Sequence, residues 1–276
     1  MRIAWATDLH LEFVEAGERL SFYEQVATEN VDAMIISGDI GTAQNVAALL
    51  HELKQQVKCR VLFVLGNHDF YGGSIPEVRD SVAALAATSE KLTYLSYSNS
   101  VPVAPGVCVA GHDGWGDARL GDHAYSTLVL SDFHLIHELA AAQSRERLGE
   151  TLRSLGDEAA THLGKVLPAA LAEHQQVIVV THVPPFREVC FHGSRPSDAN
   201  DLPYFACKAT GEAILNTARQ FPHREILVLC GHTHAAAEAR VAPNVLAIAG
   251  AAEYGQPTIQ RIFAAPIELG WESTTQ

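Results

Sequence analysis

The sequence predicts an α/β fold with a largely parallel sheet and helices packed outside it. Short apolar runs bounded by turn residues alternate with amphipathic stretches along the 276 residues, a rhythm typical of β–α–β units. The last third is denser in apolar runs, which indicates a mixed or second sheet. Because no linker, repeat or low-complexity tract divides the chain, we expect a single domain over residues 1–276.

The individual elements follow from the length and periodicity of each run. Strands are predicted at residues 3–6, 33–37, 61–65, 107–110, 177–181, 225–229, 245–249 and 258–263. Helices are predicted at residues 21–30, 43–55, 75–87, 144–172 and 205–220. The fourth helix is long, and we expect it to break at Gly149, Gly156 or Gly164, because glycine weakens a helix interior.

Two long segments, residues 111–125 and 182–204, are rich in Gly, Pro, Asp and aromatic residues. Loops of this length inside a compact domain are usually functional or mobile. Trp115 is therefore a candidate to line a substrate cleft, with core packing as the alternative. Arg187, His192 and Arg195 are candidates to bind a substrate phosphate, because arginine forms bidentate contacts with that group. A solvated loop charge is the alternative for these three.

Bulk composition narrows the possible partners. Hydrophobic residues make up 47% and charged residues 18%, which excludes a disordered chain. No apolar run approaches the ~20 residues of a membrane-spanning helix, so no membrane partner is expected. The formal net charge of −13 repels polyanions and disfavours duplex DNA or RNA as a partner. A small phosphoester substrate remains compatible, because bound divalent cations can reverse the local charge.

The N-terminus and the cysteines predict a cytoplasmic protein. Met1 and Arg2 lead directly into the first predicted strand, so no signal peptide is expected. The five cysteines are odd in number and form no CxxC pair, which argues against a disulfide framework.

Polar residues follow five of the predicted strands directly. The segments are Asp8-Leu9-His10, Gly38-Asp39, Gly66-Asn67-His68-Asp69, Thr181-His182 and Gly231-His232-Thr233-His234. In open α/β sheets ligands bind at the carboxyl ends of the strands, so we expect these segments to converge. Asp and His offer mixed oxygen and nitrogen ligands that suit Mn, Fe, Co or Zn. Two such ions roughly 3.5–4 Å apart activate a shared water for in-line displacement, so the pattern indicates phosphoryl chemistry.

Each of these residues alone also has a structural explanation. Asp8 and Asp39 could cap turns, and a single histidine is usually a surface or core residue. The Gly-Asn-His-Asp segment is a sharper signal than the Asp-x-His or Gly-Asp pairs. The hypothesis depends on all five motifs occurring in order, each at a strand end.

This set of motifs resembles the calcineurin-like metallophosphoesterase superfamily. The resemblance implies a four-layer α/β/β/α sandwich with two mixed sheets. It implies two divalent or mixed-valence transition metal ions (Mn, Fe, Zn or Co). The first would be held by Asp8, His10, Asp39 and His234, and the second by Asp39, Asn67, His182 and His232, with Asp39 as the bridge. His68 would stand beside the scissile phosphate as general acid or as donor to the transition state.

The implied activity is hydrolysis of a small phosphomonoester or phosphodiester by a metal-bridging hydroxide. The superfamily orients its catalytic histidine with a carboxylate, and whether Asp69 serves here is left open. Protein Ser/Thr phosphatases of the superfamily have an Asp-Arg pair after the bridging Asp. This chain has Ile40-Gly41-Thr42-Ala43 instead, which disfavours a phosphoprotein phosphatase.

Three alternatives to this activity remain. A phosphodiesterase for cyclic nucleotides or other small diesters would use the same site. A nuclease is disfavoured by the net charge of −13. A non-catalytic metal-binding scaffold is disfavoured because every expected ligand position is retained.

Overall fold

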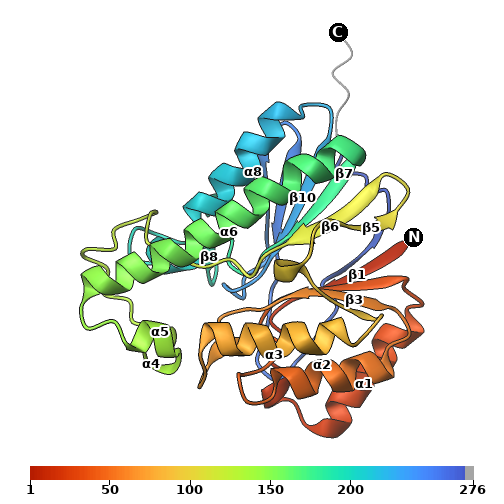
Figure 1. Ribbon diagram of the computed structural model, residues 1–276, viewed down its shortest axis with the longest axis horizontal. Helices are drawn as coiled ribbons and strands as arrows, with labels where there is room; N and C mark the ends of the chain where they lie inside the picture. The colour runs from red at the N-terminus through yellow and green to blue at the C-terminus, as the bar shows by residue number, and fades with distance from the viewer. Residues whose placement is uncertain (271–276) are drawn as a thin grey trace.

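Side chains along the strands alternate between two apolar layers, because successive residues of a strand point to opposite faces of a sheet. In the computed structural model, which describes residues 1–270, Ile3 and Trp5 pack between two sheets, whereas Ala6 packs under helices. Met34 and Ile36 likewise lie under the helices and Ile35 between the sheets. Two sheets therefore share one inner core, and each has a helix-covered outer face (Figure 1).

The first sheet has the strand order β13-β1-β2-β3-β4. Strands β1 (Arg2–Ala6), β2 (Ala33–Ser37), β3 (Arg60–Val64) and β4 (Leu92–Tyr94) are parallel, and β13 (Arg261–Ala264) is antiparallel to β1. Its outer face is covered by α1 (Ala16–Thr28), α2 (Val46–Gln56) and α3 (Ile75–Ala87).

The second sheet has the order β11-β12-β10-β7-β6-β5. The inner strands β6 (Val107–Gly111), β7 (Gln176–Val180), β10 (Glu225–Cys230) and β12 (Val245–Ala249) are parallel. The edge strands β5 (Val101–Ala104) and β11 (Ala237–Ala242) are antiparallel to their neighbours. Helices α6 (Arg145–Glu173) and α8 (Lys208–Gln220) cover the outer face.

Short elements lie in the segments between these strands and helices. They are α4 (Asp132–Leu135), α5 (His137–Ala140), α7 (Leu202–Phe205), the hairpin β8 (Phe191–His192) with β9 (Arg195–Pro196), and 3-10 helices at Leu11–Phe13, His68–Phe70, Leu95–Tyr97 and Arg187–Val189. Figure 1 shows α4 and α5 beneath the N-terminal end of α6. None of the helices within residues 1–270 is both long and apolar enough to cross a membrane.

The structure confirms the four-layer sandwich with two mixed sheets. All eight predicted strands are present, although β13 begins at Arg261 instead of residue 258. Strands β4, β5, β8, β9 and β11 were not predicted, because they are short or lie half-exposed at a sheet edge. Helix α1 begins at Ala16, five residues before the predicted start at 21.

The predicted break in the long helix is wrong, since α6 is continuous from Arg145 to Glu173. Two of its glycines allow close packing instead. A Cβ at Gly156 would lie 2.5 Å from the Cβ of Asp117, and one at Gly149 would lie 2.6 Å from Nε2 of His123. The 111–125 segment therefore packs directly on the backbone of α6 at both glycines.

Candidate metal centre

The five polar segments meet at the carboxyl ends of the parallel strands, where the backbone is strained. Five predicted ligands have a positive φ: Asp8 (49°), His10 (42°), Asp39 (52°), His232 (72°) and His234 (53°). A left-handed conformation costs a non-glycine residue roughly 1–2 kcal/mol. Among the other non-glycine residues that the structure describes, only two have this conformation. Strain of this kind concentrates at functional sites.

Two glycines that precede predicted ligands are required because a carboxylate lies too close to their backbone to leave room for a side chain. A Cβ at Gly66 would overlap the Asp39 carboxylate, and one at Gly231 would overlap the Asp8 carboxylate. The two carboxylates therefore lie directly against backbone that no side chain covers.

One cluster of ligand atoms comprises Asp8, His10, Asp39 and His234, whose donor atoms lie within 4.8 Å of one another. Nε2 of His10 is 3.1 Å from Nε2 of His234 and 3.7 Å from Oδ2 of Asp39. Oδ1 of Asp8 is 3.3 Å from Nε2 of His234. Burial would raise the pKa of Asp8, but the hydrogen bond with His234 and the charge of His182 hold it below its ordinary value.

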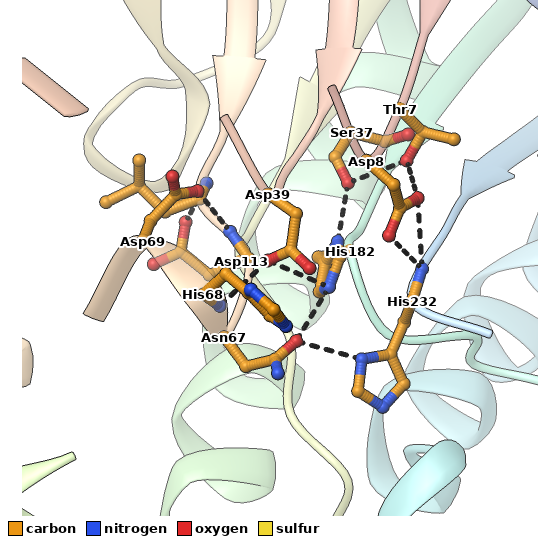
Figure 2. Close-up of polar contacts among 12 residues, drawn as sticks. Thr7, Asp8, Ser37, Asp39, Asn67, His68, Asp69, Asp113, His182 and His232 are labelled. Atoms are coloured by element: carbon orange, nitrogen blue, oxygen red, sulfur yellow. Dashed lines mark hydrogen bonds and ion pairs between the residues drawn. The ribbon is translucent and has the colours of Figure 1, made fainter. Parts of the chain in front are cut away.

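The second cluster forms around the side-chain oxygen of Asn67 (Figure 2). Nε2 of His182 and Nδ1 of His232 each lie 2.9 Å from Asn67 Oδ1. Oδ1 of Asp39 is 3.4 Å from Nε2 of His182. Asp39 thus turns one carboxylate oxygen toward each cluster.

The hydrogen-bond partners of His182 and His232 show which ring nitrogen of each carries a proton and which carries a lone pair. Nδ1 of His182 lies 2.9 Å from the carbonyl oxygen of Ser37, and Nε2 of His232 lies 3.3 Å from that of Tyr204. A carbonyl can only accept, so these nitrogens hold the protons. Burial lowers the pKa of His182 to about 4 and that of His232 to about 3, so both rings are neutral near pH 7. Each therefore turns a lone pair toward Asn67.

The end of the Asn67 amide that faces the histidines is the oxygen. Its Nδ2 faces the Asp132 carboxylate at 2.9 Å, and an ionised carboxylate accepts hydrogen bonds without donating any. Three acceptors, namely Asn67 Oδ1, His182 Nε2 and His232 Nδ1, consequently point at one another with no proton between them. Such an arrangement is repulsive unless a cation binds there, and this donor set suits a borderline transition metal.

The charges around Asp39 also favour a bound cation. Burial and the neighbouring charges of Asp8 and Asp69 raise the pKa of Asp39 well above its ordinary value. Within residues 1–270 no lysine or arginine forms an ion pair with Asp8 or Asp39, only histidines do. The residues present therefore fit two metal ions that share the Asp39 carboxylate.

His68 lies beside these clusters, at the N-terminal end of its 3-10 helix. Its backbone N–H donates to Oδ1 of Asp39 at 2.9 Å, and its ring packs on Tyr71 with centroids 4.2 Å apart. Nδ1 of His68 is 3.8 Å from Oε1 of Glu12, and Nδ1 of His10 is 3.6 Å from the same oxygen. The carboxylate that faces the predicted catalytic histidine is thus Glu12, which the sequence did not single out.

Asp69 does not face His68, so it is not the carboxylate that orients this histidine. It bonds to backbone N–H groups instead. Its Oδ1 accepts the backbone N–H groups of Ile40 at 2.9 Å and Gly41 at 2.7 Å, and its Oδ2 accepts that of Gly66 at 2.8 Å. The buried carboxylate therefore ties the loop after β2 to the loop after β3.

A cavity of about 300 Å³ opens beside both clusters. It is lined by Asp39, Asn67, His68, Tyr71, Val129, Leu130, Ser131, Asp132, Phe205, His232, His234 and Tyr254. Sequence reasoning missed the walls at 129–132 and at Tyr254. No lysine or arginine in the described part of the chain lines this cavity.

The structure does not bring the four predicted substrate-binding residues to this cavity. Trp115 is buried in the core and packs on Phe70 with ring centroids 5.5 Å apart. Arg195 forms ion pairs with Asp198 at 3.1 Å and with Asp201 at 2.9 Å. Nδ1 of His192 lies 3.7 Å from the same Asp201. Arg187 is exposed in a short 3-10 helix. Core packing explains the position of Trp115. Neighbouring carboxylates explain the positions of Arg195 and His192.

Comparison with known proteins agrees with this geometry. Residues 1–236 match the family of calcineurin-like phosphoesterases. A phosphopantetheinyl hydrolase from Mycobacterium tuberculosis has a similar structure, with a TM-score of 0.67 and 15% identity over 92% of this chain and 89% of that chain. A dimetal phosphatase from Danio rerio has a TM-score of 0.56 and 16% identity over 90% of this chain and 86% of that chain. A purple acid phosphatase from yellow lupin (Lupinus luteus) seeds has a TM-score of 0.50 and 11% identity over 98% of this chain and 46% of that chain.

Comparison with curated protein sequences finds no match. At these identities the solved structures support the fold alone, whereas the family match extends over all five motifs, from Asp8 to His234. The chain therefore belongs to the calcineurin-like phosphoesterase family and is a metal-dependent phosphoesterase.

Proposed function

We propose that this protein hydrolyses a small-molecule phosphomonoester or phosphodiester at a pair of transition metal ions. One ion would be held by Asp8, His10 and His234 and the other by Asn67, His182 and His232, and Asp39 would contribute to both sites. The observation that supports this assignment best is the orientation of Asp39, whose Oδ2 faces His10 at 3.7 Å and whose Oδ1 faces His182 at 3.4 Å.

When bound, the ions would supply Lewis acidity that activates water for attack and would neutralise charge that develops on the phosphoryl oxygens. The protein contributes the proton donor. In the imidazolium form of His68, Nδ1–H faces the Glu12 carboxylate and Nε2–H donates its proton to the leaving oxygen, which leaves a neutral ring. The backbone hydrogen bond from His68 to Asp39 fixes this donor relative to the metal ligands.

The cavity supports a small substrate. A volume of about 300 Å³ admits a compact molecule. Its walls include Phe205, Tyr71 and Tyr254, which suit an apolar or planar group, and no cationic side chain within residues 1–270 lines it for a second phosphate. The same observation favours, as a second candidate, a phosphodiesterase, because a diester has one negative charge where a monoester dianion has two.

The test is turnover of p-nitrophenyl phosphate and bis-p-nitrophenyl phosphate with Mn, Zn, Fe or Mg added separately. We expect His68→Ala to lower kcat by about 10²–10⁴-fold, the usual contribution of a general acid. Asp39→Asn should lower it by several orders of magnitude, because an amide has no negative charge and offers one ligand oxygen where the carboxylate offers two. His51→Ala, at an exposed position on α2, is the matched control and should not change the rate.

Unchanged rates in the His68 and Asp39 variants would refute the assigned roles. A higher kcat/KM for the diester selects the phosphodiesterase. Metal analysis separates both from a non-catalytic scaffold, which is favoured if the purified protein binds fewer than one equivalent after reconstitution.

A further inference from the structure

The orientation of the Asn67 amide is set by residues outside the ligand set. An amide has an oxygen at one end and an NH₂ group at the other, and only the oxygen can bind a cation. Nδ2 of Asn67 donates to Oδ1 of Asp132 at 2.9 Å and lies 3.2 Å from the Tyr71 hydroxyl. The Tyr71 hydroxyl donates to the same oxygen of Asp132 at 2.6 Å. Asp132 is buried, and the same oxygen accepts from both donors.

A rotation of the amide by half a turn would be unfavourable while Asp132 is in place. The amide oxygen would then face a carboxylate oxygen, and Nδ2 would face the lone pairs of His182 and His232. The charge of Asp132 also polarises the amide through the hydrogen bond, which makes Oδ1 a better metal ligand.

The segment that contains Asp132 is attached firmly to the turn after the Gly-Asn-His-Asp motif. The backbone N–H of Gly72 donates to the carbonyl of Leu135 at 2.8 Å, and that of His137 donates to Gly73 at 3.0 Å. The Glu138 carboxylate accepts from Oγ of Ser74 at 2.7 Å and from the backbone N–H of Ile75 at 2.9 Å. Helices α4 and α5 are therefore held beside Asn67 independently of the Asp132 side chain.

We propose that Asp132, assisted by Tyr71, is a positioning residue for the second metal ion. It holds the Asn67 amide with its oxygen toward His182 and His232, and this increases the affinity of the second site alone. The inference rests on the proposed pair of metal ions. It follows that the segment between β6 and α6, which is far from Asn67 in the sequence, controls the occupancy of the second metal site.

The test is a titration of the metal-free protein with Co²⁺, followed by visible absorption and equilibrium dialysis. Wild-type protein should bind two equivalents. In Asp132→Ala the first equivalent should bind as in the wild type and the second about 10–100-fold more weakly, the usual effect of losing such a partner. Asp132→Asn keeps a neutral acceptor for Nδ2 and should recover part of this loss. Tyr71→Phe should also weaken the second equivalent only.

Glu138→Ala is the control for a merely structural role, because Glu138 holds the same segment but contacts no proposed ligand. It should leave both affinities unchanged. The inference is overturned if Asp132→Ala binds the second equivalent as the wild type does, if it weakens both equally, or if Glu138→Ala has the same effect.

The proposed function can fail separately. Wild-type protein that binds two equivalents of Co²⁺ but hydrolyses no phosphoester contradicts the activity and leaves the positioning effect measurable. Wild-type protein that binds fewer than two equivalents overturns both. An active wild type with an unaltered second site in Asp132→Ala overturns the positioning role alone.

Discussion

Replacement of Asp69 tests whether this buried carboxylate connects the two ligand loops. Three backbone N–H groups, those of Ile40, Gly41 and Gly66, donate to it at 2.7–2.9 Å. Asp69→Ala leaves all three buried without an acceptor, at about 1–3 kcal/mol each. Because water can enter the space left by the side chain, we expect a total loss of about 3–5 kcal/mol in the free energy of unfolding.

Asp69→Asn gives a graded comparison. Its oxygen can accept from Ile40 and Gly41, but its NH₂ group then faces the N–H of Gly66. One contact of three is lost, so the expected cost is about 1–2 kcal/mol.

The assay is urea unfolding of the metal-free proteins with a chelator present, which removes the contribution of metal binding to stability. Asp80→Asn, an exposed position on α3, is the control and should change stability by less than about 0.5 kcal/mol. A loss below about 1 kcal/mol for Asp69→Ala, or equal losses for the alanine and asparagine variants, would refute the reasoning.

Two further predictions concern charged contacts. Burial would raise the pKa of Asp113, but the charge of Arg79, whose Nε lies 2.9 Å away, lowers it, so this pair stabilises the protein above the ordinary pKa and less as the pH falls below it. Arg79→Met removes the cation that faces this buried carboxylate, although the hydroxyls of Tyr94 and Ser96 still donate to it. The uncompensated charge should cost about 3–5 kcal/mol at neutral pH and less near pH 5, where the carboxyl is protonated more easily. Urea unfolding at both pH values checks this, and equal losses contradict it. Glu12→Gln removes the charge that faces His68, so it should slow esters with poor leaving groups by about 10²-fold and p-nitrophenyl esters by roughly 10-fold. Rates across a series of leaving groups measure the difference, and a uniform loss would show that Glu12 does not act through the proton donor.

The architecture could be predicted because its determinants are local. Runs such as that of β2 contain only apolar residues and end at glycine followed by aspartate, so both the strand and the ligand position are visible in the sequence. The order of five such ends was enough to place Asp8, Asn67 and His182 at one edge of the sandwich.

The residues that the sequence did not reveal depend on contacts between distant segments. Asp132 lies 65 positions from Asn67, in a four-residue helix without a periodic pattern. Glu12 faces His68 only because a left-handed residue, His10, turns the chain after β1. A signal for Glu12 did exist, since it follows His10 by two residues, but nothing in the sequence placed it beside His68. Trp115 and Arg195 looked like binding residues because a loop sequence does not tell whether a side chain packs inward or pairs with a neighbouring carboxylate.

The two sheets contribute different members of the proposed ligand set. Asp8, Asp39 and Asn67 follow strands of the first sheet, and His182, His232 and His234 follow strands of the second. An ion bound between them would cross-link the two halves of the sandwich at one edge, in addition to hydrogen bonds such as those from His182 to Ser37 and from the backbone of His232 to Asp8. Loss of metal should then loosen this edge first, so hydrogen exchange after chelation should increase at the loops after β1, β2, β7 and β10 before it increases in the strand interiors.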